Sequence, residues 1–392
     1  MEFTILFAVV VLHELLFLII MVTVLSILKT KKVPSVIATL GVVAVIGFTF
    51  YFVLHPPYKD ISTSGQYEVG STDYFVTEDE TDSYLKKGRY REIPIRKYYP
   101  MNYLDENLPV IVVSDGVKES NLDNSYLCKE IASQGYVVLS VGAPGHDSKA
   151  VLSDGTKVRT NGEFKDELSL IDKHEDLKNS YVIYHKWMSK RMKDLNFVLD
   201  DYSSKNPETK FVVMGYYIGG SAAYGLARTR EDVVAAIGLD APFLYDITAY
   251  ENNEFVFDST DYTIPVMNIY SDSSFGRVMG KEEYTNNYLF WNSTNTIYTN
   301  VHYENVYYSQ LNDRFHKTPI IAYVRDDGYP EVEYEEQLQI IRNDIVSFLE
   351  KLPQDEEVTD ENESVTGEND GINENITEEN VELNENIPQE AE

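Results

Sequence analysis

Hydrophobic residues in the middle of the chain form short continuous runs that alternate with stretches of helical periodicity. The runs are rich in Val, Ile and Leu, which is typical of strands buried on both faces of a sheet. The expected strands are 92–99, 108–114, 136–141, 211–214, 233–239, 264–270 and 296–298, with a small hairpin over 151–158. The expected helices are 122–133, 177–202 and 334–352. This alternation predicts an α/β fold, with a mostly parallel sheet covered by helices.

The first part of the chain has a different pattern. Residues 3–28 and 33–54 are nearly all apolar, and each run is long enough to span a bilayer. A Lys-Thr-Lys-Lys turn at 29–32 separates them. We therefore predict two transmembrane helices in a membrane anchor over residues 1–57. Because cationic turns remain in the cytoplasm, the body at 67–352 is expected outside the cell membrane.

The last forty or so residues carry much of the chain's negative charge. The formal net charge is −31, and residues 353–392 contain fifteen Asp and Glu, with no Lys, Arg or aromatic residue. Such a segment predicts a disordered acidic tail. A field of this sign repels phosphate backbones, which excludes a nucleic-acid partner. The single cysteine, Cys128, excludes an intrachain disulfide, and we expect no metal or cofactor.

The strand at 211–214 runs into a glycine-rich turn and then into a small-residue helical pattern. The turn reads Gly-Tyr-Tyr-Ile-Gly, with the G-x-x-x-G spacing of a nucleophile elbow, whose usual form is G-x-S-x-G. Such a turn leaves no room for a Cβ at its flanks, which accounts for Gly215, Gly219 and Gly220. The central position holds Tyr217 instead of serine.

An aspartate and a histidine follow the elbow in chain order. Asp240 comes directly after the expected strand 233–239, and His302 follows the expected strand 296–298. Sites in such sheets lie at the carboxyl ends of strands, where an Asp orients a His that transfers the nucleophile's proton. Two alternatives stay open at this point: Asp240 as a strand-end turn former, and His302 as an ordinary loop histidine.

Several stretches together carry a resemblance to a known family. They are residues 88–95, 98–100, 191–200, 238–241 and 301–302. From about residue 67 to 352 the chain resembles the platelet-activating factor acetylhydrolase group of α/β-hydrolases, with dienelactone hydrolases as more distant relatives. The resemblance implies an α/β-hydrolase fold and 1-alkyl-2-acetylglycerophosphocholine esterase activity.

The resemblance also implies roles for individual residues. It makes Asp240 the acid, His302 the base, and the backbone N–H groups of Val117 and Ile218 the oxyanion donors. Tyr217 departs from the family, which has a serine at this position. The tyrosine ring leaves no space for an acyl group at the tip. Asp115 departs too, since the family has His there and a carboxylate opposes the developing negative charge.

These two departures lead to two hypotheses. In the first, the protein has lost serine catalysis and binds a lipid-like ester or a membrane partner protein as a pseudoenzyme. In the second, it remains an esterase on lipid-like or small esters, using His302 and Asp240 with Tyr217 or a water molecule as an unusual nucleophile.

Overall fold

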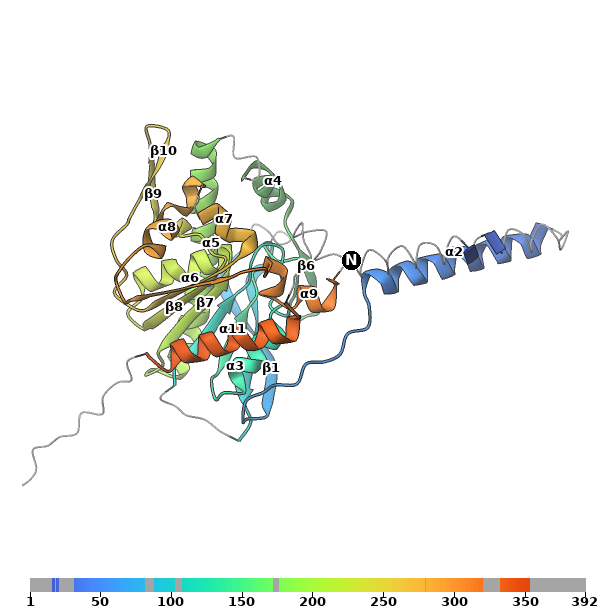
Figure 1. Ribbon diagram of the computed structural model, residues 1–392, viewed down its shortest axis with the longest axis horizontal. Coiled ribbons are helices and arrows are strands. Elements are labelled where there is room, and N and C mark those ends of the chain that lie inside the picture. Colours follow the sequence, from blue (N-terminus) through green and yellow to red (C-terminus); the bar gives the residue numbers. More distant parts are fainter. Residues whose placement is uncertain are drawn as a thin grey trace, which may run out of the picture. The chain divides into compact units, whose positions relative to one another are not determined.

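The computed structural model describes part of the chain (Figure 1). The described residues are 16–17, 19–20, 32–81, 88–102, 108–171, 176–278, 280–319 and 332–352. Contacts between residues divide the chain into two units, Met1–Leu352 and Pro353–Glu392. The predicted acidic tail and nearly all of the first predicted span lie outside the described residues.

The second predicted span coincides with the helix α2 (Lys32–Leu54). Several large apolar side chains of this helix are exposed, among them Leu40, Val43 and Phe48. Within the described ranges, however, no helix meets the combined length and apolarity required to cross a membrane.

The body is built on a mixed sheet of eight strands. In spatial order they are β1 (Val69–Thr81), β2 (Tyr90–Pro100), β4 (Val138–Val141), β3 (Val110–Ser114), β7 (Phe211–Tyr216), β8 (Val233–Leu239), β11 (Val266–Ser271) and β12 (Tyr298–Tyr303). β2 is antiparallel to both β1 and β4, and every pair from β4 to β12 is parallel. The predicted mostly parallel sheet is confirmed.

Helices cover both faces of this sheet, since successive strand residues point to opposite sides. Phe211 and Val213 pack in one core with α5 (Leu177–Lys205) and α6 (Ile218–Thr229). Val212 and Met214 pack in the other with α3 (Ser125–Ala132) and α11 (Tyr334–Leu349). Figure 1 shows α3 and α11 together beside the sheet.

Smaller elements connect these layers. The short helices are α4 (Gly162–Ile171), α7 (Asp272–Val278), α8 (Thr285–Trp291), α9 (Arg314–Lys317), η1 (Leu244–Asp246), η2 (Glu282–Tyr284) and η3 (Tyr308–Gln310). The hairpins are β5 (Lys149–Val151) with β6 (Lys157–Arg159), and β9 (Ile247–Glu251) with β10 (Glu254–Phe257). The first hairpin confirms the one expected over 151–158, with Gly155 at its turn in a left-handed conformation (φ 80°).

One predicted strand has the wrong bounds. The sequence pattern placed it at 296–298, whereas β12 runs from Tyr298 to Tyr303. Parallel pairing with β11 extends it, and the register sets Tyr270 opposite His302. His302 therefore lies inside a strand and not in the loop after it. β1 was not predicted, because alternate side chains of this edge strand are polar and exposed.

The packing of α6 on β8 makes a prediction for stability. A Cβ on Gly238 would lie 1.8 Å from Tyr224 Oη, and this buried hydroxyl donates to Asn268 Oδ1 at 2.7 Å. We expect Gly238→Ala to lower the free energy of unfolding by about 1–3 kcal/mol in chemical denaturation. Gly162→Ala is the control, because no atom lies within 4 Å of its Cβ position, and it should change stability by less than about 0.5 kcal/mol. Equal effects of the two substitutions would contradict this packing.

Candidate functional site at the strand–helix elbow

The turn between β7 and α6 has the backbone of a nucleophile elbow. Tyr217 lies between the last residue of β7 and the first of α6, with φ 46° and ψ −116°. Residues with a side chain rarely adopt such a conformation, which costs on the order of 1–3 kcal/mol. The Tyr217 N–H donates to the carbonyl oxygen of Leu239 at 3.0 Å, and this bond ties the tip to the end of β8.

The three elbow glycines lie where backbone segments come too close for a side chain. A Cβ on Gly215 would lie 2.4 Å from the carbonyl carbon of Gly219. On Gly219 it would lie 2.3 Å from the Ser114 carbonyl oxygen, and on Gly220 2.4 Å from the Cβ of Ala241. Gly215 is therefore required where α6 approaches β7, Gly219 where α6 approaches the end of β3, and Gly220 where α6 approaches the residues after β8.

The predicted oxyanion donors come from two segments that this approach brings together. Ile218 is the first residue of α6, so its N–H has no intrahelical acceptor. Val117 follows β3, and its side chain packs against the same core as the Tyr217 ring. Because Gly219 touches the end of β3, the two donor segments are neighbours in the structure.

Arg191 of α5 holds the loop that carries Val117. Its buried guanidinium donates to the carbonyl oxygens of Asp115 at 3.0 Å and Gly116 at 3.1 Å. From the other side, the Gly116 N–H donates to Glu119 Oε2 at 2.9 Å. These hydrogen bonds hold the Asp115–Gly116 and Gly116–Val117 peptide groups in place. Sequence reasoning missed this role of Arg191, which the helical pattern of 177–202 does not reveal.

The side chain of Asp115 lies in the interior next to α3. Its side chain is completely buried, and its Oδ1 accepts a hydrogen bond from the amide of Asn124, just before α3. It thus lies on the face of the sheet opposite α6. Burial, together with the nearby Asp147 and other carboxyl groups, raises the pKa of Asp115 well above its usual range. The carboxyl group is bonded on the α3 side of the sheet, whereas Ile218 begins α6 on the other side.

The Asp240 carboxyl group accepts hydrogen bonds from the end of β11 and the start of α7. Its Oδ1 accepts from the Ser271 N–H at 2.7 Å and from the Ser274 hydroxyl, while its Oδ2 accepts from the Ser271 hydroxyl at 2.5 Å. Burial raises the pKa of Asp240, and these hydrogen bonds act in the opposite direction. Between these described residues, Asp240 ties the end of β8 to the end of β11 and makes no hydrogen bond to His302.

His302 has another acidic partner. Its Nε2 lies 2.7 Å from Asp272 Oδ1, and its ring stacks on Phe275 with centroids 3.8 Å apart. The second Asp272 oxygen accepts from the Asn305 N–H. Asp272 follows β11, the neighbour of β12, and the rule that sites form at strand ends could have identified it.

A cation lies near the elbow tip. Burial lowers the pKa of the Arg277 guanidinium, but the nearby phenol groups of Tyr284 and Tyr217 and the carboxyl of Asp240 raise it, and the net change is upward. Arg277 belongs to α7, so the same short helix carries Asp272 and this cation. In the described ranges, no cluster of three His, Cys, Asp or Glu side chains is arranged to hold a metal ion.

One stretch of the chain is similar to a known protein family. Residues 64–207 match the family model for platelet-activating factor acetylhydrolase, isoform II. The matched segment contains β1 to α5, including Arg191 and the loop that carries Val117. It ends before β7, so the elbow, Asp240, Asp272 and His302 lie beyond it. No curated protein sequence matches the chain.

Solved structures show a similar fold. A ferulic acid esterase from Streptomyces cinnamoneus superposes with a TM-score of 0.52 and 16% identity, over 74% of this chain and 92% of that one. At this identity the likeness concerns the fold. The chain therefore has an α/β-hydrolase-like fold, and its residues 64–207 are similar to the acetylhydrolase family.

Proposed function

We propose that this protein is an esterase-derived α/β-hydrolase-fold protein in which serine catalysis has been lost. The observation that carries the proposal is the residue at the elbow tip. The backbone there has the strained conformation of a nucleophile position, yet the side chain is the phenol of Tyr217. A phenol ring at this point occupies the space in which an acyl group would meet a serine hydroxyl.

The surrounding hydrogen bonds support the same proposal. The Asp240 oxygens accept from two serines, and the His302 ring is stacked on Phe275 and bonded to Asp272. The acid and base that the family resemblance implies are therefore not a pair here. Without a serine at the tip, only weak effects of the oxyanion groups and of binding remain.

A second function is supported by Arg277. This cation lies near the Tyr217 phenol, and a tyrosine hydroxyl is the nucleophile of some hydrolases. In this alternative the protein is an esterase on lipid-like or small esters with Tyr217 as nucleophile. His302 would then act as base with Asp272 as its partner, in place of Asp240.

Ester hydrolysis by the full-length chain tests both functions. We expect the parent protein and Tyr217→Phe to show neither fluorophosphonate labelling nor hydrolysis of p-nitrophenyl acetate. Tyr217→Ser should gain labelling at residue 217, because the elbow backbone and the Ile218 N–H already suit a serine. Its turnover should stay low, since a hydroxyl introduced by one substitution is not aligned with a general base.

Two results would reject the loss of catalysis. The first is hydrolysis by the parent that Tyr217→Phe abolishes, which would make the tyrosine the nucleophile. The second is parent activity that persists in Tyr217→Phe and depends on His302, which would indicate an activated water.

We also propose that residues 3–54 hold the domain at the outer face of a cell membrane. The apolar character of 3–28 and 33–54 and the exposed apolar side chains of α2 support this location. A lipid-like ester or a membrane partner protein would then be near the domain.

Protease treatment of intact cells tests the location. Digestion should remove the acidic C-terminal residues and leave a shorter band that resists carbonate extraction from membranes. A C-terminus that stays protected until the cells are lysed would contradict the outward orientation. A protein that carbonate releases would contradict the anchor.

A further inference from the structure

The segment that joins α2 to β1 packs along α3 as a strap, residues 58–67. In its second half, the Ser64 N–H and hydroxyl donate to Glu130 Oε2 at 3.2 and 2.9 Å, and the Gly65 N–H donates to Ser133 Oγ at 3.1 Å. A Cβ on Gly65 would lie 2.2 Å from the Ser133 carbonyl oxygen, so the strap backbone rests directly on the helix. This half of the strap is fixed at the C-terminal end of α3.

The first half of the strap is held at the opposite end of α3. Tyr126, the second residue of this helix, donates its hydroxyl to Asp60 Oδ1 at 2.9 Å. His316 Nε2 donates to the Lys59 carbonyl oxygen at 2.7 Å. The His316 ring also packs edge-on against the rings of Tyr58 and Tyr126, with centroids 5.5 Å apart in both pairs. The strap therefore runs the whole length of α3, in the direction of that helix.

The beginning of α3 belongs to the edge of the sheet formed by the carboxyl ends of the parallel strands. Asn124, directly before α3, donates to Asp115, which follows β3. A Cβ on Gly116 would lie 2.3 Å from Tyr308 Oη, and Tyr308 belongs to the segment that leads from β12 to His316. The first half of the strap thus lies at the edge that also carries the elbow.

The chain leaves little distance between α2 and this edge. Three residues, His55, Pro56 and Pro57, separate Leu54 at the end of α2 from Tyr58. A chain of this length spans at most about 14 Å, and the two prolines restrict its conformations. With α2 as part of a membrane anchor, the carboxyl-end edge is held within about 15 Å of the bilayer.

Exposed apolar side chains are unevenly distributed between the two edges of the sheet. The connections that leave the carboxyl ends expose Leu122 after β3, Val151 and Leu170 after β4, and Val256 after β8. The connection into the amino end of β7 reads Ser-Lys-Asn-Pro-Glu-Thr-Lys at 204–210. Apolar groups enter a lipid interface favourably, whereas such a polar segment is stable in water. The carboxyl-end edge is therefore the one suited to a lipid surface.

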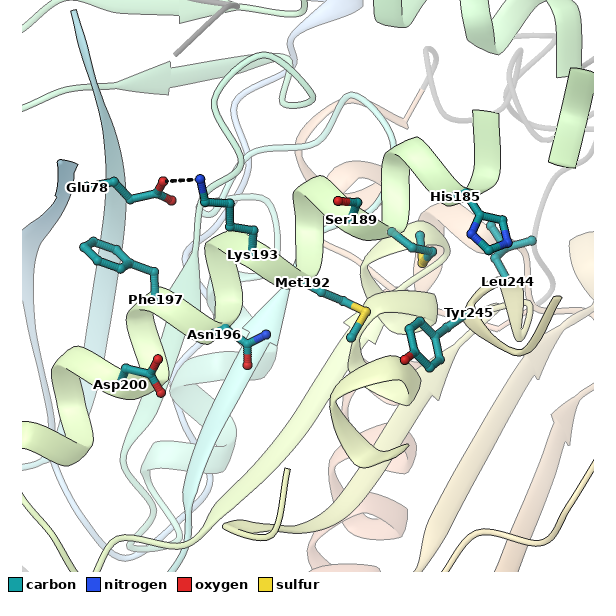
Figure 2. Close-up of a pocket in the computed structure, with 11 residues that line it drawn as sticks. Glu78, His185, Ser189, Met192, Lys193, Asn196, Phe197, Asp200, Leu244 and Tyr245 are labelled. Atoms are coloured by element: carbon teal, nitrogen blue, oxygen red, sulfur yellow. Dashed lines mark ion pairs between the residues drawn. The ribbon is translucent and has the colours of Figure 1, made fainter. Parts of the chain in front are cut away.

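A cavity of about 690 Å³ on α5 lies on the face of the sheet opposite the strap (Figure 2). Its charged groups are already paired. Glu78 Oε2 lies 3.2 Å from Lys193 Nζ, and Asp200 Oδ1 lies 2.7 Å from Arg230 Nη1. These pairs give the cavity no preference for a charged lipid headgroup, so it is not part of the proposed surface.

We propose that the strap holds the carboxyl-end edge of the sheet against the lipid surface, with Leu122 near the headgroups. The inference rests on the membrane anchor proposed above and adds the orientation of the domain to it. The elbow then lies on the membrane side of the domain, so that a ligand reaches it from the bilayer. The amino ends of the parallel strands, with residues 204–210, face away from the bilayer.

Distance-dependent quenching in the full-length chain tests this orientation. A bimane label on Leu122→Cys reports on the carboxyl-end edge, and one on Glu208→Cys reports on the opposite edge, about 20 Å away or more. Both positions are exposed, and the buried Cys128 should stay unlabelled in the parent. In phosphatidylcholine vesicles that contain a nickel-chelating lipid, we expect the label at 122 to lose most of its fluorescence. The label at 208 should keep nearly all of it.

Changes to the connection provide the controls. A flexible Gly-Ser insertion of about twenty residues between Pro57 and Tyr58 adds a mean reach of about 25 Å and should remove most of the quenching at 122. Tyr126→Phe combined with His316→Ala releases the first half of the strap and should weaken the quenching at 122. Ser62→Val, at an exposed strap residue, should leave it unchanged.

The possible failures can be told apart. Equal quenching at the two positions, or stronger quenching at 208, in a protein that resists carbonate extraction would overturn the orientation. Quenching at 122 that survives the insertion unchanged would show that the connection does not set this distance, and would also overturn the proposal. Release of the protein by carbonate would reject the anchor itself, and the orientation with it.

Discussion

The first turn of α6 approaches the ends of β3 and β7 so closely that no side chain fits between them. A Cβ on Gly219 would lie 2.3 Å from the Ser114 carbonyl oxygen, and a Cβ on Gly220 would lie 2.7 Å from that of Gly215. Both distances are shorter than van der Waals contact. This contact forces the chain to reverse within one residue, and Tyr217 takes the strained conformation. It also brings the loop that carries Val117 beside the start of the helix, where Arg191 holds it.

Such a constraint acts on the backbone and leaves the side chain at the tip undetermined. A strained turn persists when the structure around it over-determines it, and here the glycines and the Tyr217–Leu239 hydrogen bond do so. The elbow backbone therefore does not depend on which side chain stands at its tip, here that of Tyr217. The fold can keep the elbow backbone, while the chemistry depends on the side chains at and around the tip.

Strand order decides which carboxyl group meets His302. β12 lies next to β11, and β8 lies one strand further away. His302 on β12 therefore reaches Asp272 at the end of β11, while Asp240 at the end of β8 is met by Ser271 and Ser274. Because both aspartates come between the elbow and the histidine, chain order alone does not distinguish them.

Sequence patterns predicted the features that depend on local chemistry. The buried apolar runs identified β2, β3, β4, β7, β8 and β11 but not the hairpin of β9 and β10, and the glycine spacing located the elbow to the residue. Features that depend on packing were not predictable in this way. The side chain of Asp115 points across the sheet to Asn124, and β12 extends to include His302 through pairing with β11. Asp272 carried the same strand-end signal as Asp240, and only the register of the strands separates the two.

Nitrogen-15 NMR of the histidine rings in the full-length chain tests the assignment of these partners most directly. His302→Gln identifies the His302 signals, and spectra of Asp272→Asn and Asp240→Asn are compared with the parent, with the remaining histidine signals reporting on the fold. We predict that Asp272→Asn shifts the His302 ring nitrogens and changes their tautomer, whereas Asp240→Asn leaves them in place. A shift caused by Asp240→Asn and not by Asp272→Asn would contradict the account and restore Asp240 as the acid of a hydrolase triad.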